Sequence, residues 1–164
     1  MPAHPKPAPK PKKAKYNGIK ITNPDKWFGL CVRERADWTC QRCGRKYPEE
    51  YSNEGLPKAQ GLHCSHYFGR GNWAVRFDPL NAWAHCHGCH TLLGSNPHLF
   101  REWVEERLGN LYEVLVEKAN HKTNGKTAHR EENEIAAHYK AEFEKMRKQR
   151  DQGKVGRINF QGYF

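Results

Sequence analysis

The sequence predicts a small α+β fold in which a ββα core lies between flanking α-helices. Two Cys-x-x-Cys pairs, Cys40/Cys43 and Cys86/Cys89, enclose a segment in the middle of the chain. Inside that segment, apolar and polar side chains alternate over residues 62–68, which is typical of a short strand. Only 37% of the residues are hydrophobic, and the mean hydropathy is −1.01. Such a chain cannot bury a large core, so a small core stabilised by a metal fits the composition.

The four paired cysteines predict one structural zinc site, because four thiolates at tetrahedral positions are a preferred zinc shell. The N-terminus lacks the apolar region of a signal peptide, and no apolar stretch is long enough to span a membrane. We therefore expect a cytoplasmic protein with reduced cysteines, and in that compartment such pairs favour metal over disulfides. The alternative is two pairs of reduced surface thiols without a metal.

Composition divides the chain into four parts. Residues 1–20 are rich in Lys and Pro and predict a disordered tail. Residues 21–121 are expected to form the zinc-stabilised core with flanking helices. Residues 122–152 are expected to carry a C-terminal basic helix, and residues 153–164 form a Gly-rich tail without an assigned structure.

Several elements can be placed within these parts. Asn23, followed by Pro and Asp, predicts the start of a helix that runs to about Glu34. Residues 73–77 are expected to be extended after a turn, and a further helix is expected from near Cys89 to about Gly94. Cys31 has no partner in a Cys-x-x-Cys pair, so a small core residue is the simpler interpretation.

The C-terminal half predicts two longer helical regions. Residues 97–119 have a helical pattern that Gly109 should break, and residues 122–126 are expected to be a polar linker. Residues 131–150 predict a second helix with one apolar stripe. Packing onto the core is the simpler use of this stripe, and dimerisation is the alternative. The stripe consists of Ile135, Tyr139, Phe143 and Met146.

Three polar residues around the second cysteine pair suggest phosphodiester hydrolysis. His66 lies on the predicted strand, Asn81 follows in the connecting segment, and His90 comes directly after Cys89. A neutral histidine can take a proton from water, and a divalent ion can neutralise charge on a phosphate. The order His, Asn, His resembles the HNH (ββα-metal) nucleases. That resemblance implies that His66 is the base, that Asn81 orients it and that His90 binds a catalytic metal.

A more specific resemblance covers roughly residues 39–150. The chain resembles the NinG (Rap) recombination endonucleases of lambdoid phages, within the HNH superfamily. This resemblance implies a phage-encoded hydrolase that acts in the bacterial host on branched recombination intermediates, such as Holliday junctions and D-loops. It also implies a catalytic Mg²⁺ or Mn²⁺. The motifs that carry it are Ser65-His66-Tyr67, Arg76-Phe77, Asn81, Cys86-x-x-Cys89, Phe100-Arg101 and Arg107-Leu108-Gly109.

Two departures from the HNH pattern concern the catalytic metal. Many HNH enzymes have Asp before the base, where this chain has Ser65, and relatives often have His where this chain has Trp83. The additional ligands beside His90 therefore stay open. The candidates are His66, Ser65, His63 and His85.

The formal charge of +10 suggests a polyanionic partner, most simply DNA. Phosphate contacts are expected from Arg70, Arg76, Lys145, Arg147, Lys148 and Arg150. Two symmetric cuts at a junction would favour a homodimer. Three alternatives stay open: a sequence-tolerant HNH nicking endonuclease, a zinc-stabilised DNA-binding or adaptor protein with a degenerate site, and charge that serves only solubility.

Overall fold

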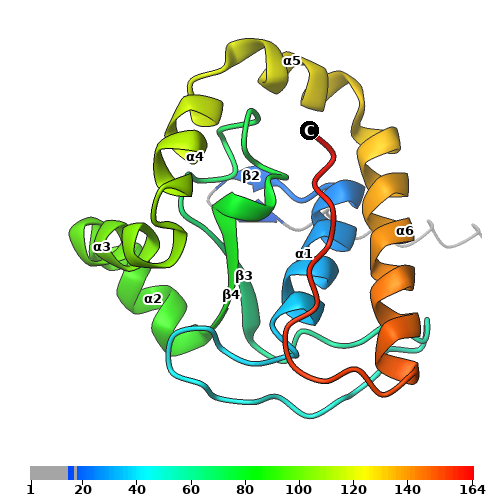
Figure 1. Ribbon diagram of the computed structural model, residues 1–164. Helices are drawn as coiled ribbons and strands as arrows, with labels where there is room; N and C mark the ends of the chain where they lie inside the picture. The colour runs from blue at the N-terminus through cyan, green and yellow to red at the C-terminus, as the bar shows by residue number, and fades with distance from the viewer. Residues whose placement is uncertain (1–14, 17) are drawn as a thin grey trace, which may run out of the picture.

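A β-hairpin lies at the centre of the fold, between two groups of helices (Figure 1). The computed structural model describes residues 15, 16 and 18–164. Strand β3 (Leu62–His66) pairs antiparallel with β4 (Ala82–Cys86), and α2 (His87–Ser95) follows β4 without a loop. Among the described residues the fold is thus a mixed α+β arrangement, as the sequence predicted, and β3, β4 and α2 follow one another as a ββα unit whose second strand is not the predicted one.

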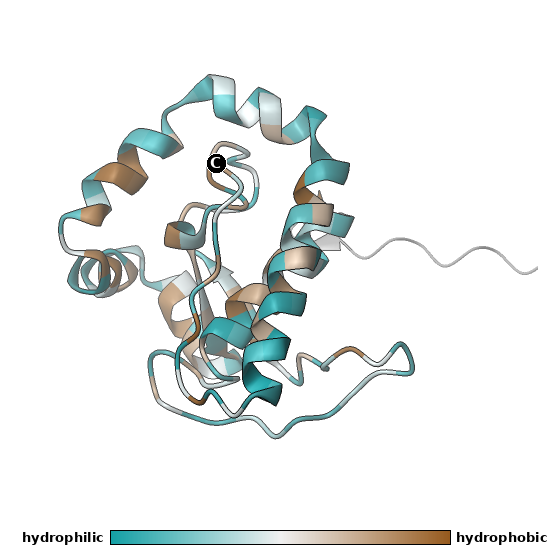
Figure 2. Ribbon diagram, turned by 45° about the vertical axis from the view of Figure 1, so that its right-hand side comes forward, coloured by the Kyte–Doolittle hydropathy of each residue, from teal (hydrophilic) through white to brown (hydrophobic). Residues whose placement is uncertain are grey.

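One side of the hairpin packs against α1 (Asn23–Arg35) and α6 (Glu132–Asp151), which lie side by side. The predicted α6 stripe is buried, with Tyr139 and Ile135 fully enclosed. In Figure 2 α6 is mostly hydrophilic, so this stripe is the part of the helix that holds it to the core. Cys31 is also fully buried, and its Sγ donates to the Tyr139 carbonyl at 3.2 Å. The stripe packs within its own chain, so the alternative of a dimer contact there is wrong.

The N-cap of helix α1 is one residue earlier than the predicted Asn23. Thr22 is the N-cap, and the Asp25 carboxylate accepts from the Thr22 backbone N–H at 2.7 Å. This capping box satisfies backbone donors that the helix leaves unpaired.

The other side of the hairpin packs against α2, α3 (Pro97–Leu108) and α4 (Leu111–Ala119). Gly109 separates α3 from α4 with a φ of +53°, as predicted. Trp83 and Trp103 meet edge to face in this second cluster, with ring centroids 5.4 Å apart. The site therefore lies on a hairpin that is covered on both faces.

Residues 73–77 form turns, so the predicted extended segment is wrong. The Asn72 side chain accepts from the Ala74 N–H at 3.1 Å, and its carbonyl accepts from Val75. This local turn chemistry overrides the strand preference of the sequence. A short 3₁₀ helix, η1 (Pro79–Asn81), then leads into β4.

The predicted polar linker is also wrong, because residues 122–130 form α5 (Lys122–Arg130). This helix crosses from α4 to α6 at the top of Figure 1. Gly125 allows a close approach: a Cβ there would lie 3.3 Å from the Ala74 backbone nitrogen. Packing against residues 73 and 74 thus compensates for the low helix propensity of a glycine.

Both ends of the described chain pack on this framework. Strand β1 (Lys15–Tyr16) pairs with β2 (Ile19–Lys20), so the predicted disordered tail is wrong for these residues; residues 1–14 and 17 lie outside the described part. The C-terminal segment passes along α1, where Ile158 is 1% exposed and donates to the Arg35 carbonyl at 3.3 Å. None of the described helices combines the length and the apolarity that a membrane span requires.

Candidate functional site

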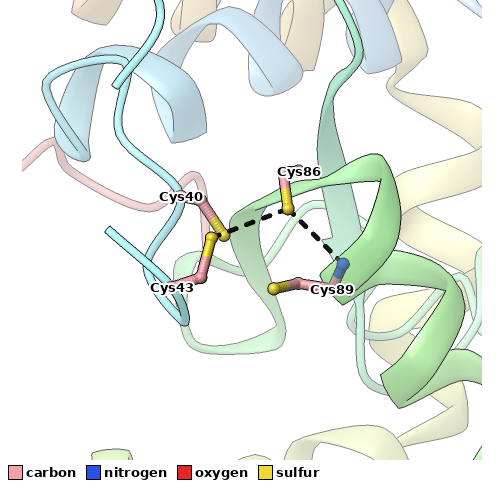
Figure 3. Close-up of side chains that lie close together, drawn as sticks. All are labelled: Cys40, Cys43, Cys86 and Cys89. Atoms are coloured by element: carbon pink, nitrogen blue, oxygen red, sulfur yellow. Dashed lines mark hydrogen bonds between the residues drawn. The ribbon is translucent and has the colours of Figure 1, made fainter. Parts of the chain in front are cut away.

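The four predicted zinc ligands lie together, two from residues 40–44, which we call the first knuckle, and two from the start of α2 (Figure 3). The Sγ atoms of Cys40, Cys43, Cys86 and Cys89 all lie within 4.8 Å of one another. The Cys43 and Cys86 Sγ atoms are 3.8 Å apart. Zn–S bonds of about 2.3 Å in a tetrahedron place neighbouring sulfur atoms about 3.8 Å apart. The cluster therefore has the dimensions of a four-thiolate metal site.

Backbone contacts fix the first knuckle against β4. Gln41 donates from its backbone N–H to the Ala84 carbonyl at 2.8 Å, and its side chain accepts from the Ala84 N–H at 2.9 Å. Gly44 closes the knuckle with a φ of +78° and donates to the Cys40 carbonyl at 2.9 Å. Cys86 has two roles, because its sulfur also accepts from the Cys89 N–H at 3.4 Å as the N-cap of α2.

The electrostatics of the cluster favour a bound cation. Burial opposes ionisation of Cys40, but backbone hydrogen bonds from Cys43, Cys86 and Arg42 outweigh it and lower its pKa to about 7. Burial and hydrogen bonds from the neighbouring thiols raise the pKa of Cys89 to about 12, although Arg42 donates to its sulfur at 3.7 Å. Without a metal, ionisation of Cys40 is thus favoured and ionisation of Cys89 is opposed. A divalent cation removes that opposition, so the donor set fits zinc.

A second cluster of polar groups lines a cavity of about 670 Å³ next to the metal site. We call it the histidine pocket. Strand β3 supplies His63, Ser65 and His66, and α2 supplies His90. Arg33 and Arg70 also line it, and its lining contains no carboxylate. Two guanidinium groups in a lining without a carboxylate favour an anionic ligand such as phosphate, and the same two arginines also line an adjoining cavity with Asp25 and Glu54.

His66 is held as a neutral imidazole with a defined tautomer. Its Nε2 lies 2.9 Å from the Arg76 carbonyl oxygen, which can only accept, so Nε2 carries the proton. Nδ1 is then left as a lone-pair acceptor. Burial, and next the charge of Arg70, lower the pKa of His66 to about 4. His66 therefore stays neutral at physiological pH, as a general base must before it acts.

His90 faces β3 from the first turns of α2. Its Nδ1 lies 3.1 Å from the Ser65 Oγ, and its ring stacks on His63 with centroids 4.5 Å apart. His63 lies 3.4 Å from His87 through ring nitrogens. The Ser65 Oγ and the His90 Nδ1 thus lie within hydrogen-bonding distance of each other. Among the described residues, however, only the four cysteines form a group of three or more metal-binding Cys, His, Asp or Glu side chains.

Asn81 is fully buried and fixes the connection between the two strands. Its Oδ1 accepts from the Phe68 N–H at 2.8 Å, while its Nδ2 donates to the Phe68 and Val75 carbonyls at 2.9 and 3.0 Å. Its side chain forms no hydrogen bond to His66. Asn81 instead closes the segment whose Arg76 carbonyl holds His66, which is an indirect way to orient that ring.

His85 does not line the histidine pocket, so its candidacy as a catalytic ligand finds no support there. The ring is fully buried against Phe100 and Trp103, with centroids 6.1 and 4.8 Å away. Burial, and next the charge of His90, lower its pKa to about 3. His85 is thus packed against the aromatic side chains of α3 and lies outside the histidine pocket.

Arg76 is the clearest correction among the predicted DNA contacts. Its side chain is 1% exposed, and it donates to the Asp25 carboxylate at 2.6 and 3.0 Å. It also donates to the Lys20 carbonyl at 2.9 Å. A guanidinium enclosed in this way cannot reach a phosphate, so Arg76 ties β2 and α1 to the pocket loop.

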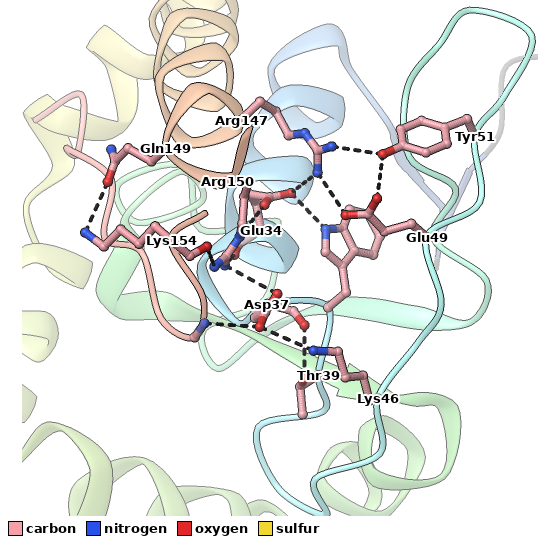
Figure 4. A network of polar contacts seen from close by, with 12 residues as sticks. Glu34, Asp37, Thr39, Lys46, Glu49, Tyr51, Arg147, Gln149, Arg150 and Lys154 are labelled. Carbon is pink, nitrogen blue, oxygen red and sulfur yellow. Dashed lines mark hydrogen bonds and ion pairs between the residues drawn. The ribbon is translucent and has the colours of Figure 1, made fainter. Parts of the chain in front are cut away.

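The basic end of α6 is largely part of the fold as well (Figure 4). Glu34 is fully buried and accepts from Arg150 at 2.8 Å, from Arg147 at 3.3 Å and from Trp38 at 2.8 Å. A buried carboxylate needs such partners, so these arginines have a structural task. Lys145 pairs with Glu142 at 2.7 Å, while Lys148 is exposed on the helix surface.

Sequence reasoning missed Arg33 as a pocket residue. It lies on α1, and its Nε donates to the Leu62 carbonyl at 2.6 Å. Burial, and to a lesser extent Arg70, lower its pKa from the usual value. No local motif marks it, because only the packing of α1 against β3 brings it to the pocket.

The lowered pKa of His66 predicts a pH effect on stability. Between pH 6.5 and about 4 the unfolded chain binds a proton that the folded chain excludes, so stability should fall as pH decreases through this window. The effect of this one group reaches at most about 3 kcal/mol. The unfolding free energy of His66→Gln should therefore fall less than that of the unmodified chain between pH 7 and pH 4.5, measured by urea unfolding. Parallel profiles, or a His66 ring that titrates near pH 6.5 by NMR, would contradict the prediction.

Comparison with known proteins assigns no family: no protein-family model, curated protein or solved structure matches the chain. The functional assignment therefore depends on the residues and their geometry.

Proposed function

We propose that the chain is a metal-dependent DNA endonuclease of the HNH type, which hydrolyses phosphodiesters in branched DNA. One observation carries the proposal. The histidine pocket brings together a neutral His66 with a defined tautomer, the Ser65–His90 donor pair and two arginines. The ββα unit is joined to the four-cysteine site at Cys86. A metal bound there would therefore fix the junction of β4 and α2.

His66 acts as the general base in this proposal. With Nε2–H bonded to the Arg76 carbonyl, the Nδ1 lone pair accepts the proton of a water molecule that attacks phosphorus. The imidazolium that forms keeps its Nε2 hydrogen bond to the carbonyl. Asn81 holds this geometry by closing the segment between Phe68 and Val75.

Arg33 and Arg70 bind the scissile phosphate in this proposal. Both line the histidine pocket, and a phosphate there would receive charge-assisted hydrogen bonds from planar guanidinium groups. Their charge also stabilises the additional negative charge of the transition state, which is the main task of a site for phosphoryl transfer.

His90 and Ser65 would hold the catalytic divalent ion. The ion would polarise the phosphate and stabilise the leaving oxygen. Because no carboxylate lines the pocket, the donors suit an imidazole-binding ion such as Zn²⁺, Ni²⁺ or Co²⁺ better than Mg²⁺, which prefers carboxylate oxygens. Mn²⁺ and Mg²⁺ would depend more on the oxygens of the substrate and of water.

The branched substrate is tested by a direct comparison. We expect faster cleavage of a four-way junction or D-loop than of a linear duplex with the same sequence, because the +10 chain shows no recognisable base-reading helix. The assay uses both substrates at equal concentration with Mg²⁺, Mn²⁺, Zn²⁺, Ni²⁺ or Co²⁺ added separately. Equal rates would remove the branched-DNA preference, and absence of cleavage with every ion would remove the nuclease. A homodimer would introduce paired cuts in opposite strands.

The absence of carboxylates from the lining of the histidine pocket also favours a second function, DNA binding without cleavage. A zinc-stabilised DNA-binding or adaptor protein with a degenerate HNH site would keep the cysteine cluster and the basic pocket. It would bind junctions but cut none of them. A sequence-tolerant nicking endonuclease would instead cut duplex and junction alike, so one experiment separates the three candidates.

A further inference from the structure

Helix α5 presents a row of cations that no part of the proposed cleavage chemistry uses. Lys122, Lys126 and Arg130 are spaced at every fourth residue, so they lie on one side of the helix. All three are exposed. Lys122 and Lys126 form no ion pair with any residue that the structure describes, whereas Arg130 pairs with Glu131 at 3.0 Å. Helix α5 itself contains no acidic residue.

This row borders an open groove of about 730 Å³, which we call the α5 groove. Its other wall is the turn at Asn72 and Trp73, and its lining contains no carboxylate. The Trp73 ring has the Arg76 guanidinium on it at 4.4 Å and the His129 ring at 4.4 Å. These partners occupy the Trp73 ring, so the groove offers a ligand its exposed cations in a lining without a carboxylate, which is typical of surfaces that bind a phosphate backbone.

The α5 groove and the histidine pocket are lined by consecutive residues of one loop. Arg70 lines the histidine pocket and Gly71, the next residue, lines the α5 groove. The loop that carries them is held in place, since Asn72 donates to the Ala119 carbonyl at 3.0 Å. Gly125 packs tightly on the same loop. A strand that leaves the pocket over this loop therefore meets the cations of α5 at a fixed position.

We propose that the α5 groove binds the phosphate backbone of the DNA strand next to the cleaved position. This inference rests on the proposed function, because it names how the same substrate is held. Arg130 comes eight residues after Lys122, a rise of about 12 Å at 1.5 Å per residue. At about 3.4 Å per nucleotide of one strand, this row matches three to four consecutive phosphates. The contacts are made to phosphates and are independent of base sequence.

The test is DNA binding by the full-length, zinc-loaded chain and its Lys122→Gln/Lys126→Gln variant. Fluorescence anisotropy with a four-way junction, without added divalent metal, separates binding from cleavage. Each lost phosphate contact lowers the slope of log K against log salt by about 0.9 on duplex arms, so the double variant should lose about 1.8. Its affinity at moderate salt should fall on the order of tenfold.

The matched control is Lys58→Gln/Lys140→Gln, which removes the same charge from two exposed lysines on other elements. It should bind within about twofold of the unmodified chain, and both variants should keep their zinc. Unchanged slope and affinity in the α5 variant, an equal loss in the control, or no junction binding by the unmodified chain overturns the inference. An α5 variant that binds and cuts normally refutes this inference alone. Binding that depends on α5 without cleavage by any metal form refutes the nuclease proposal alone.

Discussion

Replacing Cys86 with serine is expected to abolish both zinc binding and cooperative folding. Cys86 ends β4, caps α2 and contributes one of four sulfur atoms that join the first knuckle to the ββα unit. Structural zinc contributes about 10–16 kcal/mol in small zinc-dependent peptides. A domain has about 5–15 kcal/mol of total stability, so the loss of the metal exceeds what this small core can supply. Metal analysis of purified protein and thermal unfolding by circular dichroism measure the two effects.

The matched control is Cys64→Ala, which changes a buried cysteine outside the cluster. It should keep one equivalent of zinc and unfold at a somewhat lower temperature, because only a small side chain is removed from the core. A Cys86→Ser variant that retains zinc and a sharp unfolding transition contradicts the prediction. So does an unmodified chain that contains no zinc and is folded.

The parts of the fold that the sequence predicted well are those with strong local signals. The Cys-x-x-Cys spacing predicted the cluster of four sulfur atoms, and Gly109 ends α3 where the sequence predicted a break. The alternation over residues 62–68 gave β3, and the apolar stripe gave α6. In each of these cases the local pattern and the tertiary packing favour the same structure.

The failures have tertiary causes. Helix α5 has residues of low helix propensity in its middle, Gly125 above all, and that glycine lets it pack on residues 73 and 74. Trp73 and its neighbours look like a strand, but the Asn72 turn decides their conformation. Neither compensation can be read from a window of the sequence.

Charge was the least informative signal for the site. Arg76 and Arg150 looked like DNA contacts, yet their partners Asp25 and Glu34 lie 51 and 116 residues away in the chain. Arg33 gave no signal at all and lines the histidine pocket. The sequence named the histidines of the pocket because their order is local. It could not separate cations that hold the fold from cations available to a ligand, since only the packing pairs them.

Replacing His66 with alanine is expected to reduce DNA cleavage by about a hundredfold to ten-thousandfold, the usual contribution of a general base. Zinc content and junction affinity should stay close to those of the unmodified chain, because His66 is not a cysteine-site ligand and its only bond from Nε2 is to the Arg76 carbonyl. His90→Ala should also lose cleavage, with partial recovery at high metal concentration. Asn81→Ala should lose less of the cleavage rate than His66→Ala. It should also be less stable than the unmodified chain, since it leaves the Phe68 and Val75 backbone groups without a partner.

Two controls separate catalysis by His66 from a role in structure. His98→Ala removes an exposed histidine that does not line the pocket, so it should cut at the normal rate. Added imidazole should partly restore cleavage by His66→Ala, because a free base can occupy the space that the side chain leaves, whereas a misfolded variant would not respond. Normal cleavage by His66→Ala would show that another group takes the proton. Loss of junction binding together with cleavage would instead place His66 in the binding surface.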